Sequence, residues 1–133
     1  MLFRSLLIFS FATDALMDYI GLDEAARTRM HSSIYTLESH INYLQEVKTG
    51  AEMRIETQLI THDAKRLHIY HAMYLSGAAE PVSASEQMLL HVDMRGPKSA
   101  PFRPEVLARV QTIATAHAHL PQPKYAGRLI RLP

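Results

Sequence analysis

The 133-residue sequence contains no cysteine. This absence excludes a disulfide-stabilised scaffold, a thiolate metal site and a cysteine nucleophile, and it is typical of a cytoplasmic protein. The net charge is only +1 at pH 7, so no broad electrostatic field would attract nucleic acid or a membrane surface. Any phosphate group would therefore have to be bound by a local cluster of basic side chains.

Sequence motifs of several common active sites are also missing. There is no glycine-rich phosphate loop, no G-x-S-x-G turn and no H-E-x-x-H motif. The histidine spacings argue against a metal site, because His68 and His71 fall on opposite faces of a strand. The apolar run near the N-terminus is too short to span a bilayer. The sequence therefore predicts no metal, no cofactor and no membrane span.

The composition that remains is that of one globular domain over residues 1–133, with 47% hydrophobic residues. Helical periodicity predicts helices over residues 2–20, 23–30 and 104–119. Alternation of polar and apolar residues predicts strands over 33–47, 51–61, 66–75 and 82–94. This order predicts an α+β fold, in which helix covers one face of an antiparallel sheet.

The register between the third and fourth predicted strands follows from matching their apolar faces. The match places Met73 opposite Ala84, and His71 opposite Glu86. A buried carboxylate without a partner is costly, so a hydrogen bond between His71 and Glu86 would satisfy both side chains. Such a pair could be a satisfied element of the core or a catalytic pair.

The first predicted strand, "YTLESHINYLQEV", has two unlike faces. Strict alternation places polar side chains in one row: Thr36, Glu38, His40 and Asn42. This row is either a solvated sheet face or the polar floor of a cleft. In a cleft, Glu38 would act as base or nucleophile, and His40 would donate a hydrogen bond.

Three segments carry a resemblance to a known family: "ESHINYL", "HDAKRLH" and "EQMLLHVD". They resemble the hotdog-fold acyl-CoA thioesterases of the 4-hydroxybenzoyl-CoA thioesterase-like branch, and most of all the betainyl-CoA thioesterases of bacterial carnitine degradation. The resemblance implies hydrolysis of a short acyl-CoA, for example betainyl-CoA to glycine betaine and CoA, without a cofactor. It also implies an antiparallel sheet around a central helix, and a homodimer or homotetramer with active sites between subunits.

One departure from the family concerns its catalytic loop. The resemblance implies a first strand and a D-x-x-G-H-type loop with a catalytic Asp, but this sequence opens inside the central helix, and residues 1–10 match poorly. The expected fold is thus a hotdog fold that lacks the first strand. Among the residues present, Glu38 is the candidate carboxylate, and His40 and Asn42 would orient water or the thioester carbonyl. The alternatives are a catalytically inactive binding or assembly module and a dehydratase, which is disfavoured by its different sequence context.

Two further groups of residues are candidates for substrate contacts. Basic side chains at predicted turns are either surface charges or ligands of the CoA phosphates: Lys65, Arg66 and Arg103. A trimethylammonium head group favours aromatic faces. Tyrosines are available for that purpose or for ordinary packing: Tyr35, Tyr43, Tyr70 and Tyr74.

Overall fold

The computed structural model describes the backbone of residues 2–45, 47 and 50–127, with side chains from residue 7 onward. The elements in chain order are α1 (Leu2–Tyr19), α2 (Glu24–Met30), β1 (Ser32–Tyr43), β2 (Met53–His62), β3 (Arg66–Leu75), β4 (Ser83–Asp93), β5 (Lys98–Ser99) and α3 (Pro104–His117). All predicted helices and strands are therefore present, with ends that differ by a few residues, and only the short β5 was not predicted.

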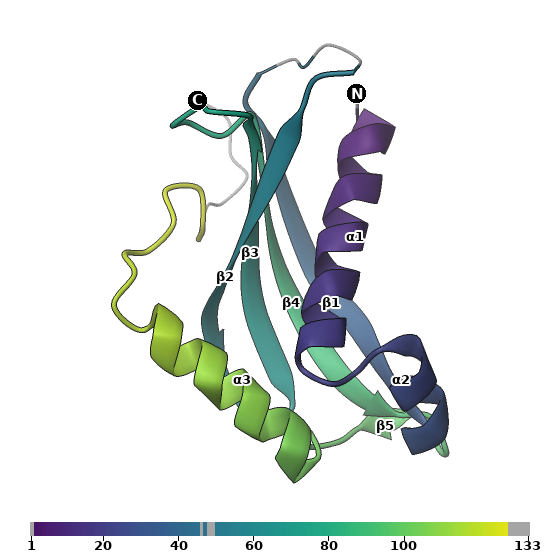
Figure 1. Ribbon diagram of the computed structural model, residues 1–133. Helices are drawn as coiled ribbons and strands as arrows, with labels where there is room; N and C mark the ends of the chain where they lie inside the picture. Colours follow the sequence, from purple (N-terminus) through teal and green to yellow (C-terminus); the bar gives the residue numbers. More distant parts are fainter. Residues whose placement is uncertain (1, 46, 48–49, 128–133) are drawn as a thin grey trace.

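The strands form an antiparallel sheet in the order β1-β4-β3-β2, with β5 paired to the end of β4. Figure 1 shows the sheet curving around α1, while α3 lies beside the β2 edge. Both helices pack on the same face of the sheet, because Met17 of α1 and Val106 of α3 share one core with Ile69 and Leu89. We call this the inner face, and the opposite one the outer face.

Helix α1 buries one side against the inner face. Phe9, Met17 and Ile20 recur at helical spacing and are buried. Each such burial stabilises the fold by about 1.5–3 kcal/mol. The helix ends at Tyr19, and Gly21 follows with a φ of 89°, in the left-handed region that glycine adopts without a Cβ penalty. The Leu22 N–H then donates to the Met17 carbonyl, which closes the helix end.

The register between β3 and β4 differs from the prediction by one residue. His71 lies opposite Ser85, and Met73 lies opposite Ser83. The inner face of β4 carries these buried serines, whereas Ala84 is buried on the outer face beneath the C-terminal segment. Because both faces of β4 are covered, its apolar residues do not mark the face that packs on the helices, and apolar matching gave the wrong register.

The predicted His71–Glu86 pair is wrong for the same reason. Glu86 lies on the outer face, where its Oε2 is 2.6 Å from His68 Nε2. Its carboxylate also accepts hydrogen bonds from the Gly127 N–H, at 2.9 and 3.1 Å. Glu86 therefore fastens the C-terminal segment to the sheet, and the buried His71 has other partners.

A β-bulge at Leu37 interrupts the alternation of β1. Thr36 lies opposite Leu89, but Glu38 lies opposite Met88, so Leu37 is the extra residue. Paired residues share a face, so Thr36 points to the inner face and Glu38 to the outer face. The predicted row is therefore wrong at Thr36, although its other members do lie together on the outer face.

Candidate functional site

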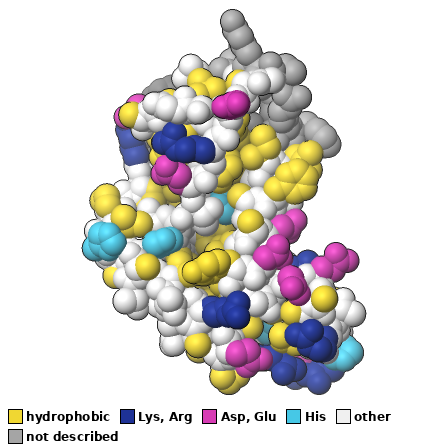
Figure 2. Space-filling view, viewed as in Figure 1, with side chains coloured by type: hydrophobic (Ala, Val, Ile, Leu, Met, Phe, Trp, Pro, Cys, Tyr) yellow, Lys and Arg dark blue, Asp and Glu magenta, His cyan; other side chains and the backbone are white. Residues whose placement is uncertain are grey.

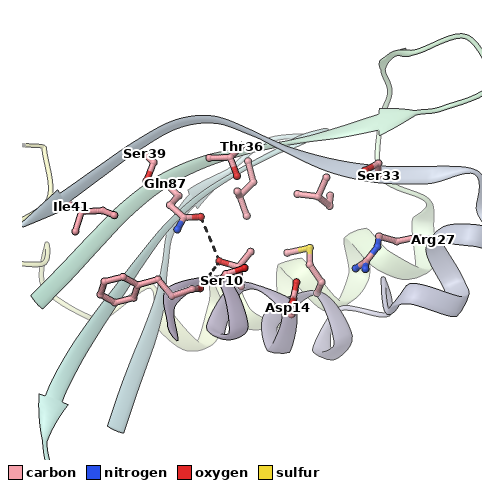
Figure 3. Close-up of a pocket in the computed structure, with 13 residues that line it drawn as sticks. Ser10, Asp14, Arg27, Ser33, Thr36, Ser39, Ile41 and Gln87 are labelled. Atoms are coloured by element: carbon pink, nitrogen blue, oxygen red, sulfur yellow. Dashed lines mark hydrogen bonds between the residues drawn. The ribbon is translucent and has the colours of Figure 1, made fainter. Parts of the chain in front are cut away.

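A cavity of about 380 Å³ lies on the inner face, between α1 and the β1–β4 part of the sheet (Figure 3). We call it the α1 cavity. Its apolar walls include Phe9, Met17 and Leu89, which belong to the cores on either side. Its polar lining comes from helices and strands far apart in the sequence: Ser10, Thr13, Asp14, Arg27, Ser33, Thr36, Ser39 and Gln87. A space with apolar walls and a few convergent polar groups is suited to a small organic ligand.

The charged groups at this cavity are Asp14 and Arg27. Asp14 rises from α1, and Arg27 enters from α2 (Figure 3). The Arg27 guanidinium donates to the Leu22 carbonyl at 2.8 Å, and within the described residues no ion pair joins it to Asp14. The Asp14 carboxylate is thus available to accept a proton from water or to balance a cationic ligand.

A chain of hydrogen bonds runs from the cavity wall into the core. The fully buried His71 ring lies 2.9 Å from the Thr13 hydroxyl through Nε2 and 2.7 Å from the Thr57 hydroxyl through Nδ1. Burial lowers the pKa of His71 to about 4, so the ring is neutral at pH 7. The Phe9 ring stacks on it, with centroids 6.1 Å apart.

This buried ring predicts how stability depends on pH. An unfolded histidine has a pKa of about 6.5, so below that value the unfolded chain binds a proton that folded His71 does not. The His71 contribution to the free energy of unfolding is therefore complete above pH 6.5 and falls by about 3 kcal/mol as the pH drops to 4. Denaturant titrations at several pH values measure how steeply the unfolding free energy falls between pH 6.5 and 4, and this fall should be smaller in His71→Gln than in the wild type. His119→Asn, which changes an exposed histidine, should show the same pH dependence as the wild type. An unchanged pH dependence in His71→Gln would contradict the proposed contribution of the His71 ring.

The sequence-predicted catalytic residues lie elsewhere. Glu38, His40 and Asn42 form a row on the outer face of β1, with Glu38 exposed. The structure therefore brings the three together, as expected, but on the face opposite the α1 cavity of the same subunit. Their catalytic role stays a prediction.

The predicted CoA-binding residues meet at one end of the sheet. The Phe102 N–H donates to the Ala64 carbonyl at 2.8 Å, which places Arg103 beside the turn that carries Lys65 and Arg66. Lys65 Nζ donates to Ser99, but Arg66 pairs with Asp63 at 2.6 Å. Backbone N–H donation from Lys65, together with the Arg66 contact, holds the pKa of Asp63 below its usual value.

The predicted tyrosines do not form one group. Tyr35 and Tyr43 are both exposed on β1. They point to opposite faces of the sheet, because their strand partners lie on opposite faces of β4. Tyr70 and Tyr74 line a second cavity of about 500 Å³ on the outer face, together with Tyr125. Burial raises the pKa of Tyr70 to about 12. Arg54 already lies 4.3 Å above the Tyr74 ring, so one aromatic face there is occupied by a cation of the protein itself.

Sequence reasoning missed the polar residues of the α1 cavity. Ser10, Thr13 and Asp14 stand in α1 between the buried residues Phe9 and Met17, so three polar residues interrupt the apolar sequence there. That interruption was the available signal. Gln87 and Arg27 gave no local signal, because only the folded chain brings them to α1.

The space-filling view shows that apolar side chains and acidic groups gather on the side of the molecule where α1 lies (Figure 2).

Residues 3–110 match the family model described as the thioesterase-like superfamily. A betainyl-CoA thioesterase of Pseudomonas aeruginosa is 57% identical over 128 residues, which are 96% of this chain and 80% of that protein. An L-carnitine dehydrogenase/betainyl-CoA thioesterase of Agrobacterium fabrum is 43% identical over 129 residues, which are 97% of this chain but 26% of that much longer protein.

Solved structures have the same architecture. The crystal structure of a thioesterase-like protein of Pseudomonas putida superposes with a TM-score of 0.82 at 46% identity, over 98% of this chain and 82% of that one. A Staphylococcus aureus protein solved in complex with CoA superposes with a TM-score of 0.92 at 22% identity, over the same shares of the two chains, and this likeness bears on the fold alone. Among the described residues, no helix is both long and apolar enough to cross a membrane.

Proposed function

Since this chain belongs to the thioesterase-like superfamily, we propose that it hydrolyses a short acyl-CoA thioester, with betainyl-CoA as the substrate. The observation that carries the substrate is the 57% identity to a betainyl-CoA thioesterase over nearly the whole chain. The observation that supports the reaction is a cavity in which a carboxylate and an amide line the same space. Hydrolysis of this thioester yields glycine betaine and CoA. We propose that this reaction is a step of carnitine metabolism.

In the proposed mechanism, Asp14 acts as the general base. The thioester carbonyl enters the α1 cavity, and Asp14 removes a proton from a water molecule whose oxygen attacks the carbonyl carbon. The tetrahedral intermediate then collapses, the carbon–sulfur bond breaks, and the CoA thiolate leaves and takes up a proton. We favour Asp14 over Glu38 because Asp14 lines the cavity within a single subunit.

A homodimer, or a homotetramer built from such dimers, is part of the proposal. Strand β1 ends the sheet order, and Leu37 on it is 53% exposed. Leu7 and Phe11 expose further apolar surface on α1. A long edge strand with exposed apolar side chains invites pairing with a second chain. In a dimer, Glu38, His40 and Asn42 of one subunit could reach a substrate held by the other, and sedimentation analysis measures the assembly directly.

We further propose that Lys65, Arg66 and Arg103 contact the CoA phosphates. Their support is that two turns far apart in sequence meet at one end of the sheet. That end also adjoins the α1 cavity, since the His91 N–H donates to the Lys65 carbonyl while Ile34 of the cavity wall lies opposite His91. Tyr35 and Tyr43 remain proposed substrate contacts. A cytoplasmic location is proposed on the absence of cysteine.

The test is release of free CoA from betainyl-CoA and from acetyl-CoA, followed with a thiol reagent. Because the chain has no cysteine, the reagent detects only the CoA product. We expect turnover of betainyl-CoA with a kcat/KM at least tenfold above that for acetyl-CoA. Heat-denatured protein is the control. Binding of CoA without turnover of either thioester would refute hydrolysis and support the inactive binding module.

A further inference from the structure

We infer that the side-chain amide of Gln87 donates a hydrogen bond to the carbonyl oxygen of the bound thioester, and that the buried His71 positions this amide through Thr13. The inference rests on the proposed hydrolysis and adds a group that would stabilise the developing negative charge. Gln87 lies on the inner face of β4, and its side chain reaches into the α1 cavity above α1 (Figure 3).

The hydrogen bonds of Gln87 leave one donor free. Its Oε1 accepts from the Thr13 hydroxyl at 3.4 Å, and its Nε2 donates to Ser85 Oγ at 3.1 Å. A primary amide has two N–H donors. Within the described part of the chain, the Ser85 contact uses one of them, and the other is left for a ligand in the cavity.

The orientation of this amide follows from the position of a single proton on Thr13. The Thr13 hydroxyl has one hydrogen, which it can give to the Phe9 carbonyl at 3.2 Å or to Gln87 Oε1. We assign the Nε2–H tautomer to His71, in which the ring donates to the Thr13 oxygen across the 2.9 Å contact. Nδ1 of the neutral ring then accepts from the Thr57 hydroxyl.

With this tautomer the Thr13 hydrogen is not used by His71, and it is available to Gln87 Oε1 as well as to the Phe9 carbonyl. Facing a donor, Gln87 turns its oxygen to Thr13 and its NH₂ group to Ser85 and the cavity. Because His71 is fully buried and both of its ring nitrogens are bonded, this arrangement exists before substrate binds. A preorganised donor of this kind stabilises an oxyanion more than water does, because it needs no reorganisation during the reaction.

The first experiment removes the donor. Gln87→Met keeps the length of the side chain but has no N–H, so we expect kcat for betainyl-CoA and for acetyl-CoA to fall by about 10²–10³-fold. KM should change by less than about threefold, because the lost interaction forms mainly in the transition state. Gln111→Met, on the exposed side of α3, is the matched control and should keep wild-type kinetics.

The second experiment separates positioning from packing at His71. A glutamine places its amide nitrogen where Nε2 lies, whereas an asparagine places its amide near Nδ1. We therefore expect kcat of His71→Gln to stay within about threefold of the wild-type value. The kcat of His71→Asn should fall nearly as far as that of Gln87→Met. Thermal melting of both variants establishes that each is folded at the assay temperature. Equal kcat values for the two would overturn the positioning role.

The third experiment asks whether Thr13 acts through Gln87. Thr13→Val should lower kcat at least tenfold alone but add little in a Gln87→Met background, because the two residues act in series. Thr112→Val is the control, since that hydroxyl also donates to a carbonyl four residues earlier but lies on exposed α3. Additive losses would overturn the inference.

The wild-type assay distinguishes the two levels of the proposal. If the wild type hydrolyses neither thioester, the proposed function fails and the inference fails with it. If the wild type is active and Gln87→Met is equally active, only the inference is overturned.

Discussion

Replacing Asp14 with asparagine is expected to lower kcat for betainyl-CoA and for acetyl-CoA alike, by about 10²–10⁴-fold. Asparagine has the size of aspartate but cannot take a proton from water. The loss should not depend on the acyl group, because the base acts on water. The measurement is steady-state release of CoA over a range of substrate concentrations, so that kcat and KM are obtained separately.

Two matched variants make this result specific. Asp18→Asn changes another exposed aspartate one turn along α1, outside the α1 cavity, and should leave kcat unchanged. Glu38→Gln tests the carboxylate predicted from sequence. A large loss in Glu38→Gln with none in Asp14→Asn would transfer the role of base to Glu38. A loss confined to betainyl-CoA in Asp14→Asn would instead make Asp14 the counter-ion of the trimethylammonium group.

The largest loss of stability is expected from Phe9→Ala, at about 3–5 kcal/mol of unfolding free energy. Phe9 is 1% exposed, packs with Met73 and Val82, and stacks on the His71 ring. Among the described side chains in the N-terminal half of α1 it is the buried one, so its removal leaves a cavity beneath the helix that carries Thr13 and Asp14. Urea denaturation followed by circular dichroism measures the change.

The control for this variant is Tyr19→Ala on the same helix. Tyr19 is 63% exposed, so removal of its ring should change the unfolding free energy by less than about 0.5 kcal/mol. Equal losses in the two variants would mean that α1 is not held to the sheet through Phe9. Because α1 supplies Asp14, we also expect Phe9→Ala to lower the rate of hydrolysis at temperatures where the variant is still folded.

Local patterns in the sequence were sufficient for most of the fold. The helical stripe of α1 and the alternation of β2 each reflect one covered face, so the elements and the α+β class could be predicted. The resemblance supplied the hotdog fold and the thioesterase family, and both are confirmed by the family match and by the superposed structures.

Other features depend on contacts between distant parts of the chain. The register of β3 and β4 could not be predicted, because the C-terminal segment around Tyr125 covers the outer face of β4 and hides its polarity pattern. The polar lining of the α1 cavity could not be predicted either, because Asp14, Arg27 and Gln87 meet only after α1 has packed on the sheet. No local pattern in one segment contains that information.

The bulge at Leu37 determines which side chains of β1 line the α1 cavity. With the bulge present, Ser39 and Ile41 face the ligand space, and Glu38 and His40 face away from it. If β1 paired without a bulge and kept Leu37, uninterrupted alternation from Thr36 would turn Glu38 and His40 inward. A shift of the strand pairing by one position, with no change of sequence, would therefore exchange a nearly neutral surface for an ionisable one, whereas deletion of Leu37 would leave Glu38 opposite Met88 and both rows on their present faces.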